Sequence, residues 1–230
     1  MRAFLASTLL LMILAAEAGR PPTLLVLGDS ISAGYGVTDD EGWVELLHAR
    51  LEVHGFPHDV ANISLSGEKT WRGQVRLPTA LERYDPVIVV IQLGINDVMQ
   101  GLPEGIEEPP LEVIRTRLTD MVNRAQASGA RVMLLGVRLP ARYGPNYGRR
   151  FEDVYRGVAD TTGATLVPRV LARAEDTDLD DRHHRLLEGD SIHPTPRGHA
   201  LLLDNIWPTL LPLLRQTFSA PVLGRPIKIA

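Results

Sequence analysis

Four short segments of the 230-residue chain carry groups that together could do chemistry on a carbonyl carbon. Ser30 offers a hydroxyl, which is a weak nucleophile until a neighbouring base removes its proton. An imidazole can do this near neutral pH, because its unperturbed pKa is about 6.5, and His193 supplies one. Asp190 lies three residues earlier, close enough to hold the other ring nitrogen and favour the correct tautomer. Alone, this Asp-x-x-His pattern is more typical of a helix-capping aspartate before a surface histidine.

Hydrogen-bond donors for a developing negative charge are also present. Asn96, in Gly94-Ile95-Asn96-Asp97, carries a side-chain amide suited to stabilising an oxyanion. Gly67 follows a weaker apolar run, and a glycine lets the backbone N–H approach a ligand closely. Each segment taken singly is also typical of an ordinary turn, since Gly, Asn and Asp favour turns.

The segments that must position these residues alternate between apolar runs and helical periodicity. This alternation predicts an α/β protein whose parallel sheet is covered on both faces. The predicted strands are 24–27, 60–63, 87–93, 132–137 and 166–167. The predicted helices are 43–53, 71–81, 111–127, 151–159 and 196–214, with Pro78 interrupting the second and Pro208 bending the last. Ser30, Gly67 and Asn96 each follow a predicted strand, where open α/β sheets place their binding crevices.

Two long segments, 98–110 and 138–149, also follow predicted strands and should overhang the same crevice. Apolar residues on them could line a groove for an acyl chain. These residues are Met99, Leu102, Leu139, Tyr143 and Tyr147. The alternative is that some of them only pack the loops onto the domain, because pocket and core contacts look alike in a sequence.

The amino terminus has the three-part pattern of a secretory signal peptide. Arg2 is followed by a mainly apolar stretch over 3–15 and then by Ala16-Glu17-Ala18, with small residues at the two positions that a signal peptidase reads. The apolar stretch is shorter than the roughly 20 residues of a membrane-spanning helix. The sequence therefore predicts a signal peptide over 1–18 and a periplasmic or secreted bacterial protein. An uncleaved amino-terminal anchor is the alternative.

Composition narrows the remaining possibilities. The hydrophobic fraction of 44% suits a globular core, and we expect one domain over 19–218 followed by a loose tail over 219–230. The net charge of −4, without a basic block, argues against nucleic acid as a partner. The chain has no cysteine, which excludes disulfides, thiolate metal sites and a lipid-modified cysteine anchor.

The other histidines do not indicate a metal centre. His183 and His184 are adjacent, but no second ligand cluster accompanies them, so a solvated loop is the favoured interpretation. We expect the remaining four at the surface or partly packed, namely His48, His54, His58 and His199. No cofactor is predicted, because no phosphate-binding glycine loop of the G-x-G-x-x-G type is present. A nucleotide binder is therefore a weak alternative.

Four blocks in one order give the chain a specific resemblance. Gly28-Asp29-Ser30-Ile31-Ser32, Gly67, Gly94-Ile95-Asn96-Asp97 and Asp190-Ser191-Ile192-His193 resemble the blocks of the SGNH (GDSL-type) hydrolases, and the likeness extends over most of 23–214. The resemblance implies a flavodoxin-like three-layer α/β/α sandwich with about five parallel strands. Within the family, the chain is most similar to secreted bacterial esterases, thioesterases, lysophospholipases and arylesterases.

The resemblance also implies a role for each matching residue. Ser30 would be the nucleophile, His193 the base and Asp190 its acidic partner. The backbone N–H groups of Ser30 and Gly67 and the Asn96 amide would form the oxyanion hole. Asp29 would fix the turn around Ser30 without being the acid of the triad.

The function that follows is hydrolysis of esters or thioesters of acyl chains, with a small-molecule or lipid ester as substrate. A carbohydrate O-acetyl esterase on the same scaffold is the first alternative. A non-catalytic binding module is a further one, since a fold does not fix a function. The sequence leaves the oligomeric state open, and no membrane anchor is expected once the signal peptide is removed.

Overall fold

Five parallel strands form the centre of the molecule. The structure, a computed structural model, describes residues 21–99, 111–171 and 186–218. The strands are β1 (Thr23–Gly28), β2 (Asp59–Asn62), β3 (Ile88–Gln92), β4 (Arg131–Leu135) and β5 (Thr165–Val167). They pair in the order β2-β1-β3-β4-β5, and every pairing is parallel. This order is that of flavodoxin-like sheets, which confirms the predicted fold class.

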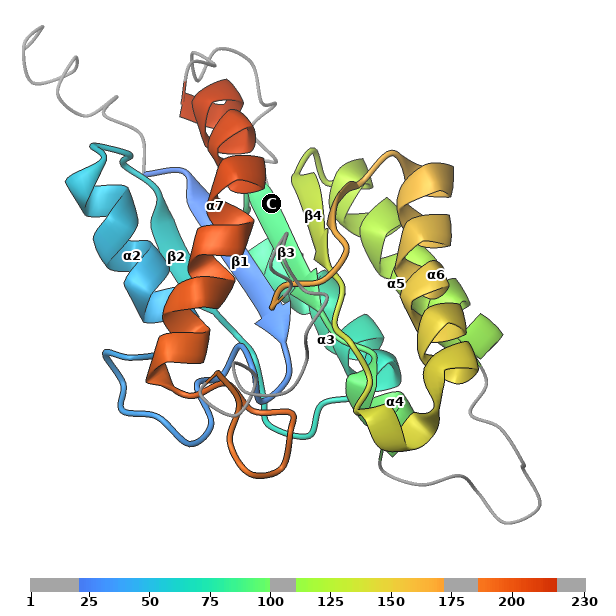
Figure 1. The fold of residues 1–230 in the computed structure, drawn as a ribbon. Coiled ribbons are helices and arrows are strands. Elements are labelled where there is room, and N and C mark those ends of the chain that lie inside the picture. Colours follow the sequence, from blue (N-terminus) through green and yellow to red (C-terminus); the bar gives the residue numbers. More distant parts are fainter. Residues whose placement is uncertain (1–20, 100–110, 172–185, 219–230) are drawn as a thin grey trace, which may run out of the picture.

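Helices cover both faces of the sheet and complete the three layers (Figure 1). The helical elements are α2 (Trp43–Val53), α3 (Thr70–Tyr84), α4 (Ile95–Met99), α5 (Leu111–Ala127), the 3₁₀ turn η1 (Ala141–Tyr143), α6 (Pro145–Thr162) and α7 (Pro196–Phe218). Helices α2 and α7 lie together on one face, and α3, α5 and α6 pack side by side on the other. Among the described residues, no helix is both long enough and apolar enough to cross a membrane.

The core lies in the central strands because they are covered on both sides. Leu24–Leu27 of β1 and Ile88–Ile91 of β3 are completely buried, which explains why these runs are continuously apolar instead of alternating. The edge strand β2 is only half-buried, and its apolar pattern is correspondingly weaker. The central strands thus have the stronger apolar patterns in the sequence, and the edge strand β2 has a weaker one.

The connections leave β1 and β3 toward opposite faces of the sheet. At such a switch point the loops after the two strands diverge and leave a crevice at their carboxyl ends. Gly28, the last residue of β1, is in register with Gln92, the last residue of β3. The segments that carry Ser30 and Asn96 therefore begin next to each other.

Two expectations about prolines are wrong. Pro78 does not interrupt its helix, since α3 continues through it while Leu77 and Ala80 pack against the core. The segment 138–149 is not one long loop, because α6 begins at Pro145. A proline at the first helical position loses no hydrogen bond, so Pro145 starts a helix where its type alone indicates a loop.

Candidate active site

Ser30, His193 and Asp190 lie in one hydrogen-bonded row. The Ser30 Oγ is 2.8 Å from the His193 Nε2, and the His193 Nδ1 is 2.5 Å from the Asp190 Oδ2. Ser30 is 8% exposed, His193 is partly exposed and Asp190 is open to solvent. A hydroxyl, an imidazole and a carboxylate in this order can activate the hydroxyl and stabilise the imidazolium that forms.

The end of β1 fixes the position of Ser30. Backbone hydrogen bonds run from Ala33 N–H to the Asp29 carbonyl (2.9 Å) and from Tyr35 N–H to the Ser30 carbonyl (3.0 Å), so the chain coils tightly after the strand. Gly28 makes room for this coil, because an added Cβ would lie 2.6 Å from the Ser32 Oγ. The hydroxyl is thus held just beyond the carboxyl end of β1, next to the end of β3.

Asp190 and His193 share one short loop that is closed on itself. An antiparallel bridge joins Leu187 to Pro194, and the Glu188 N–H donates to the His193 carbonyl at 2.8 Å. The Asp190 Oδ1 accepts the backbone N–H groups of Ile192 (2.9 Å) and His193 (3.0 Å), which leaves Oδ2 for the ring. Partial burial acts to raise the pKa of Asp190, but hydrogen bonds from the His193 ring and these two N–H groups bring it below the ordinary value. The carboxylate is therefore ionised at neutral pH.

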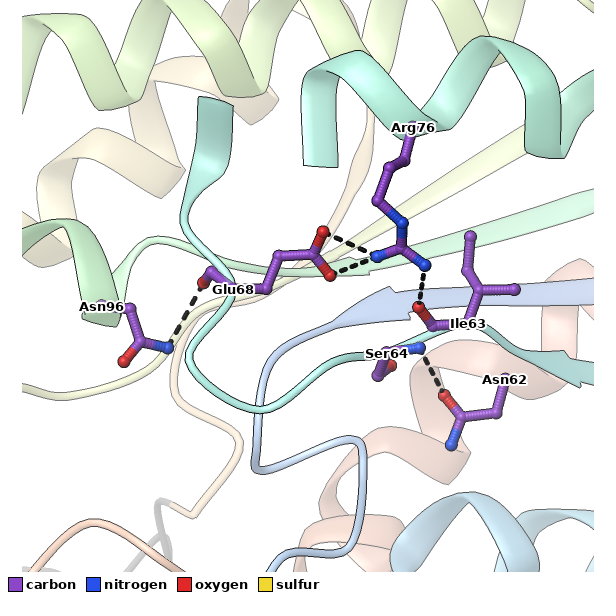
Figure 2. Close-up of polar contacts among 6 residues, drawn as sticks. All are labelled: Asn62, Ile63, Ser64, Glu68, Arg76 and Asn96. Carbon is purple, nitrogen blue, oxygen red and sulfur yellow. Dashed lines mark hydrogen bonds and ion pairs between the residues drawn. The ribbon is translucent and has the colours of Figure 1, made fainter. Parts of the chain in front are cut away.

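Gly67 and Asn96 are tied to each other and to the Ser30 segment. The loop that follows β2 is attached to β1 by a hydrogen bond from Leu65 N–H to the Gly28 carbonyl (3.0 Å). The Asn96 Nδ2 donates to the carbonyl of Glu68, the residue next to Gly67, at 3.3 Å (Figure 2). Gly67 has a φ of 75°, a conformation that favours glycine. The structure thus brings these two predicted donors into one neighbourhood with Ser30.

Asp29 is buried and lies next to Ser30 in the chain, outside the hydrogen-bonded row. Its Oδ1 accepts the N–H of Ile31 at 3.0 Å, which ties down the turn that follows β1. Burial raises the pKa of Asp29 to about 7, against the opposing effect of this hydrogen bond. The hydrogen bond to the Ile31 backbone agrees with the turn-fixing role that the family resemblance implies for Asp29.

A series of hydrogen bonds between buried polar groups supports the turn that follows β1. The Ser32 hydroxyl donates to the Gln92 Oε1 (2.7 Å) and accepts the Trp43 indole N–H (3.3 Å). The Trp43 backbone N–H in turn donates to the His199 Nδ1 at 3.3 Å. His199 and His58 are both buried, so the expectation that they lie at the surface or partly packed is wrong for both. One ring nitrogen of each histidine is hydrogen-bonded, since the His199 Nδ1 accepts the Trp43 N–H and the His58 Nε2 lies 2.8 Å from the Thr217 hydroxyl of α7.

The burial of His199 makes stability depend on pH. Burial lowers its pKa to about 4, the nearby Glu41 carboxylate acts in the opposite direction, and His193 lowers it further. An imidazole with a pKa of about 6.5 in the unfolded chain and about 4 in the folded protein binds more protons when unfolded. The stability that it contributes is therefore complete above pH 6.5 and is lost as the pH falls toward 4.

Replacing His199 by Asn should remove this dependence. Asn can accept the Trp43 N–H but does not titrate. From pH 7.5 to pH 4.5, the unfolding free energy of the His199→Asn variant should therefore fall by about 2 to 3 kcal/mol less than that of wild type. Urea unfolding at both pH values measures the difference. The exposed His48→Asn change is the matched control and should leave the wild-type dependence intact. Equal acid sensitivity in wild type and His199→Asn would contradict the assignment.

The predicted groove residues fall into different environments. Leu139 is only 4% exposed and packs in the core. Met99, Tyr143 and Tyr147 are partly buried against the core, and the two tyrosine rings lie 6.5 Å apart. Leu102 lies outside the described residues. Leu139 thus has the packing role that the sequence left open as the alternative.

Sequence reasoning missed one exposed aromatic residue beside His193. The Tyr35 ring lies 4.7 Å from the His193 ring, centre to centre, and the side chain is 57% exposed. Its position between Gly34 and Gly36, five residues after Ser30, could have indicated an aromatic side chain at the tip of the turn. The described residues hold no group of three or more His, Cys, Asp or Glu side chains arranged for a metal, and His183 and His184 lie outside them.

Comparison with known proteins gives one consistent picture. Residues 26–201 match the GDSL-like lipase/acylhydrolase family. The chain is 40% identical to the esterase TesA of Pseudomonas aeruginosa over 93% of this chain and 100% of that protein. It is 31% identical to the thioesterase 1/protease 1/lysophospholipase L1 of Escherichia coli K12 over 90% of this chain and 91% of that protein.

A solved structure agrees with the relatives found by sequence. The crystal structure of TesA superposes with a TM-score of 0.72 at 39% identity, covering 83% of this chain and 99% of that one. The chain belongs to the GDSL-like lipase/acylhydrolase family of SGNH hydrolases and is an ester-cleaving enzyme.

Proposed function

We propose that this enzyme cleaves carboxylic esters and thioesters of acyl chains by acyl transfer to Ser30, with His193 as base and Asp190 as its partner. The observation that carries the proposal is the row of two hydrogen bonds, 2.8 Å from the serine hydroxyl to the imidazole and 2.5 Å from the imidazole to the carboxylate. The names of the relatives, which include an esterase and a thioesterase, support the same substrate class.

In the first step the acyl group moves from the substrate to the enzyme. The Ser30 oxygen attacks the carbonyl carbon while the His193 Nε2 takes the hydroxyl proton, and Asp190 stabilises the positive ring that results. The carbonyl oxygen becomes an oxyanion, for which the N–H groups of Ser30 and Gly67 and the Asn96 amide are the donors. The tetrahedral species then expels the alcohol or thiol, which receives the proton from His193, and Ser30 is left as an acyl ester.

In the second step water takes the place of the alcohol. His193 removes a proton from the water as its oxygen attacks the acyl ester, and the same donors hold the second oxyanion. Collapse breaks the bond to the Ser30 oxygen, which recovers its proton from His193. The products are the free carboxylic acid and the original enzyme, so the cycle needs no cofactor.

A series of p-nitrophenyl esters from acetate to palmitate tests this function. We expect turnover of chains longer than acetate, because apolar side chains such as Met99, Tyr143 and Tyr147 are only partly buried on the segments that follow β3 and β4. Hydrolysis confined to acetate would favour a carbohydrate O-acetyl esterase instead. The absence of hydrolysis at every chain length would contradict the proposal and favour a binding module.

We further propose that residues 1–18 are a cleaved signal peptide and that the mature enzyme acts in the periplasm or outside the cell. The charged, apolar and small-residue regions, which follow one another in this order over 2–18, support this. Amino-terminal sequencing of the exported protein checks it, with Gly19 expected as the first residue. An intact Met1 in that material would favour the anchor.

A further inference from the structure

A partly buried ion pair lies beside the predicted oxyanion donors. The Glu68 side chain is completely buried, and one nitrogen of Arg76 is 2.6 Å and 2.5 Å from its two carboxylate oxygens. The other terminal nitrogen of Arg76 donates to the Ile63 carbonyl at 2.7 Å (Figure 2). A carboxylate is costly to bury unless a partner neutralises it and fills its hydrogen bonds, and Arg76 does both.

Arg76 spans the loop that contains Gly67. Ile63 lies where this loop leaves β2 and Glu68 lies just after Gly67, so one guanidinium holds both ends of the segment 63–68. The carbonyl of Glu68 accepts the Asn96 amide, which connects the same segment to a second predicted donor. Displacing Glu68 would therefore shift Gly67 and Asn96 together.

The helix that carries Arg76 is itself fixed to the Asn96 segment. Thr70, the first residue of α3, donates its N–H (2.8 Å) and its hydroxyl (2.6 Å) to the two carboxylate oxygens of Asp97. Asp97 follows Asn96 directly in α4. Helix α3, which carries Arg76, is thus anchored to Asp97, one residue after the predicted donor Asn96.

The charge of Glu68 also bears on the site. Its carboxylate is close enough to Asp29 to contribute to the raised pKa of that group, and Asp29 is the neighbour of Ser30. An unpaired carboxylate at this position would oppose the negative charge that develops on the substrate oxygen, because interactions between charges are strong in a partly buried site. The positive charge of Arg76 offsets this repulsion.

We propose that Arg76 is a positioning residue for the reaction, holding the 63–68 loop and neutralising Glu68 so that Gly67 and Asn96 can stabilise the oxyanion. This rests on the proposed function. It predicts that Arg76 contributes to the transition state more than to binding of the ground-state ester. Loss of Arg76 should therefore lower kcat and leave KM nearly unchanged.

Arg76→Met tests the proposal in steady-state hydrolysis of a p-nitrophenyl ester. We expect kcat to fall about 10- to 100-fold with KM within about threefold of wild type. The double variant Glu68→Gln/Arg76→Met removes both charges. Its log kcat should lie at least about a third of the way back from Arg76→Met to wild type. Arg50→Met is the matched control, because Arg50 also forms an ion pair, with Asp204 at 2.7 Å, but outside the site.

A double-mutant cycle separates positioning from general stability. Asn96→Ala alone should lower kcat about 100- to 1,000-fold. If Arg76 acts through the same donors, Arg76→Met should cost much less in the Asn96→Ala background than in wild type. An equal cost in both backgrounds, or a rise in KM with kcat unchanged, would overturn the proposal.

Arg76→Lys keeps the test decisive if the methionine variant does not fold. Lysine retains the charge but cannot bind both Glu68 and the Ile63 carbonyl, so kcat should fall by about three- to tenfold with KM unchanged. A wild-type kcat in Arg76→Lys would contradict the proposed role of Arg76 in holding the 63–68 loop. Hydrolysis by wild type and Arg50→Met tests the proposed function separately. If neither hydrolyses the ester, the proposed function fails; if both do and the Arg76 variants match them, only this inference fails.

Discussion

Ser30→Ala is expected to lower kcat for p-nitrophenyl ester hydrolysis by at least about 10⁴-fold while leaving the fold intact. The change removes the oxygen that we propose forms the acyl bond, and the remaining groups can only polarise the substrate for attack by water. The fold should tolerate the loss, because the Ser30 backbone hydrogen bond from Tyr35 remains and only the hydroxyl contact to His193 disappears. Circular dichroism and thermal unfolding check the fold, and initial rates check the chemistry.

A covalent probe gives the same prediction a second readout. A fluorophosphonate should label wild type once per chain and should not label Ser30→Ala, because the probe reacts with an activated serine hydroxyl. Ser128→Ala is the matched control, since the Ser128 hydroxyl caps the end of α5 through the Ala125 carbonyl, far along the chain from the site. Unchanged turnover or labelling in Ser30→Ala would remove Ser30 from the mechanism.

Asp190→Asn is expected to lower kcat about 10³- to 10⁴-fold. Asn keeps an oxygen for the backbone N–H groups of Ile192 and His193, so the loop should retain its shape. The other position becomes an NH₂ group, which donates to the His193 Nδ1 and cannot accept a proton from it. The ring proton is then held on Nε2, which can no longer take the serine proton. The effect should therefore appear in kcat and not in stability.

Glu188→Gln is the control for charge alone, because it removes a negative side chain from the same loop, two residues before Asp190. It should change kcat by less than about threefold, since exposed charges contribute little. A loss as large as that of Asp190→Asn would mean that the loop's net charge matters and that the hydrogen bond to the ring does not. Near-normal activity of Asp190→Asn would assign the acid elsewhere.

The sheet could be predicted well because its strands differ in burial in the way that a parallel sheet requires. Completely buried strands such as β1 and β3 need continuous apolar runs, and those runs stand out. The short helix α4 could not be found, because Asn96 and Asp97 in five residues after a glycine have the composition of a turn. Its two buried residues, Ile95 and Val98, acquire meaning only from the core that they contact.

The site could be predicted only in part from local patterns. Asp190 and His193 are three residues apart, so their contact follows from short-range geometry. Ser30 and His193 are separated by 163 positions, and no spacing rule joins them. Their pairing was suggested by the ordered blocks of the family. The contact of Tyr35 with His193 and the contacts of Arg76 with the 63–68 segment are tertiary, so composition and periodicity do not encode them.

The closed loop that carries Asp190 and His193 has a consequence for how this enzyme could change over generations. Its bridge and backbone hydrogen bonds lie outside the buried sheet, so the two residues proposed as base and acid are held by contacts separate from those of the core. A substitution there can silence the reaction without lowering the free energy of unfolding. The same scaffold is therefore able to lose catalysis and persist as a folded protein, or to regain it by repairing one short segment.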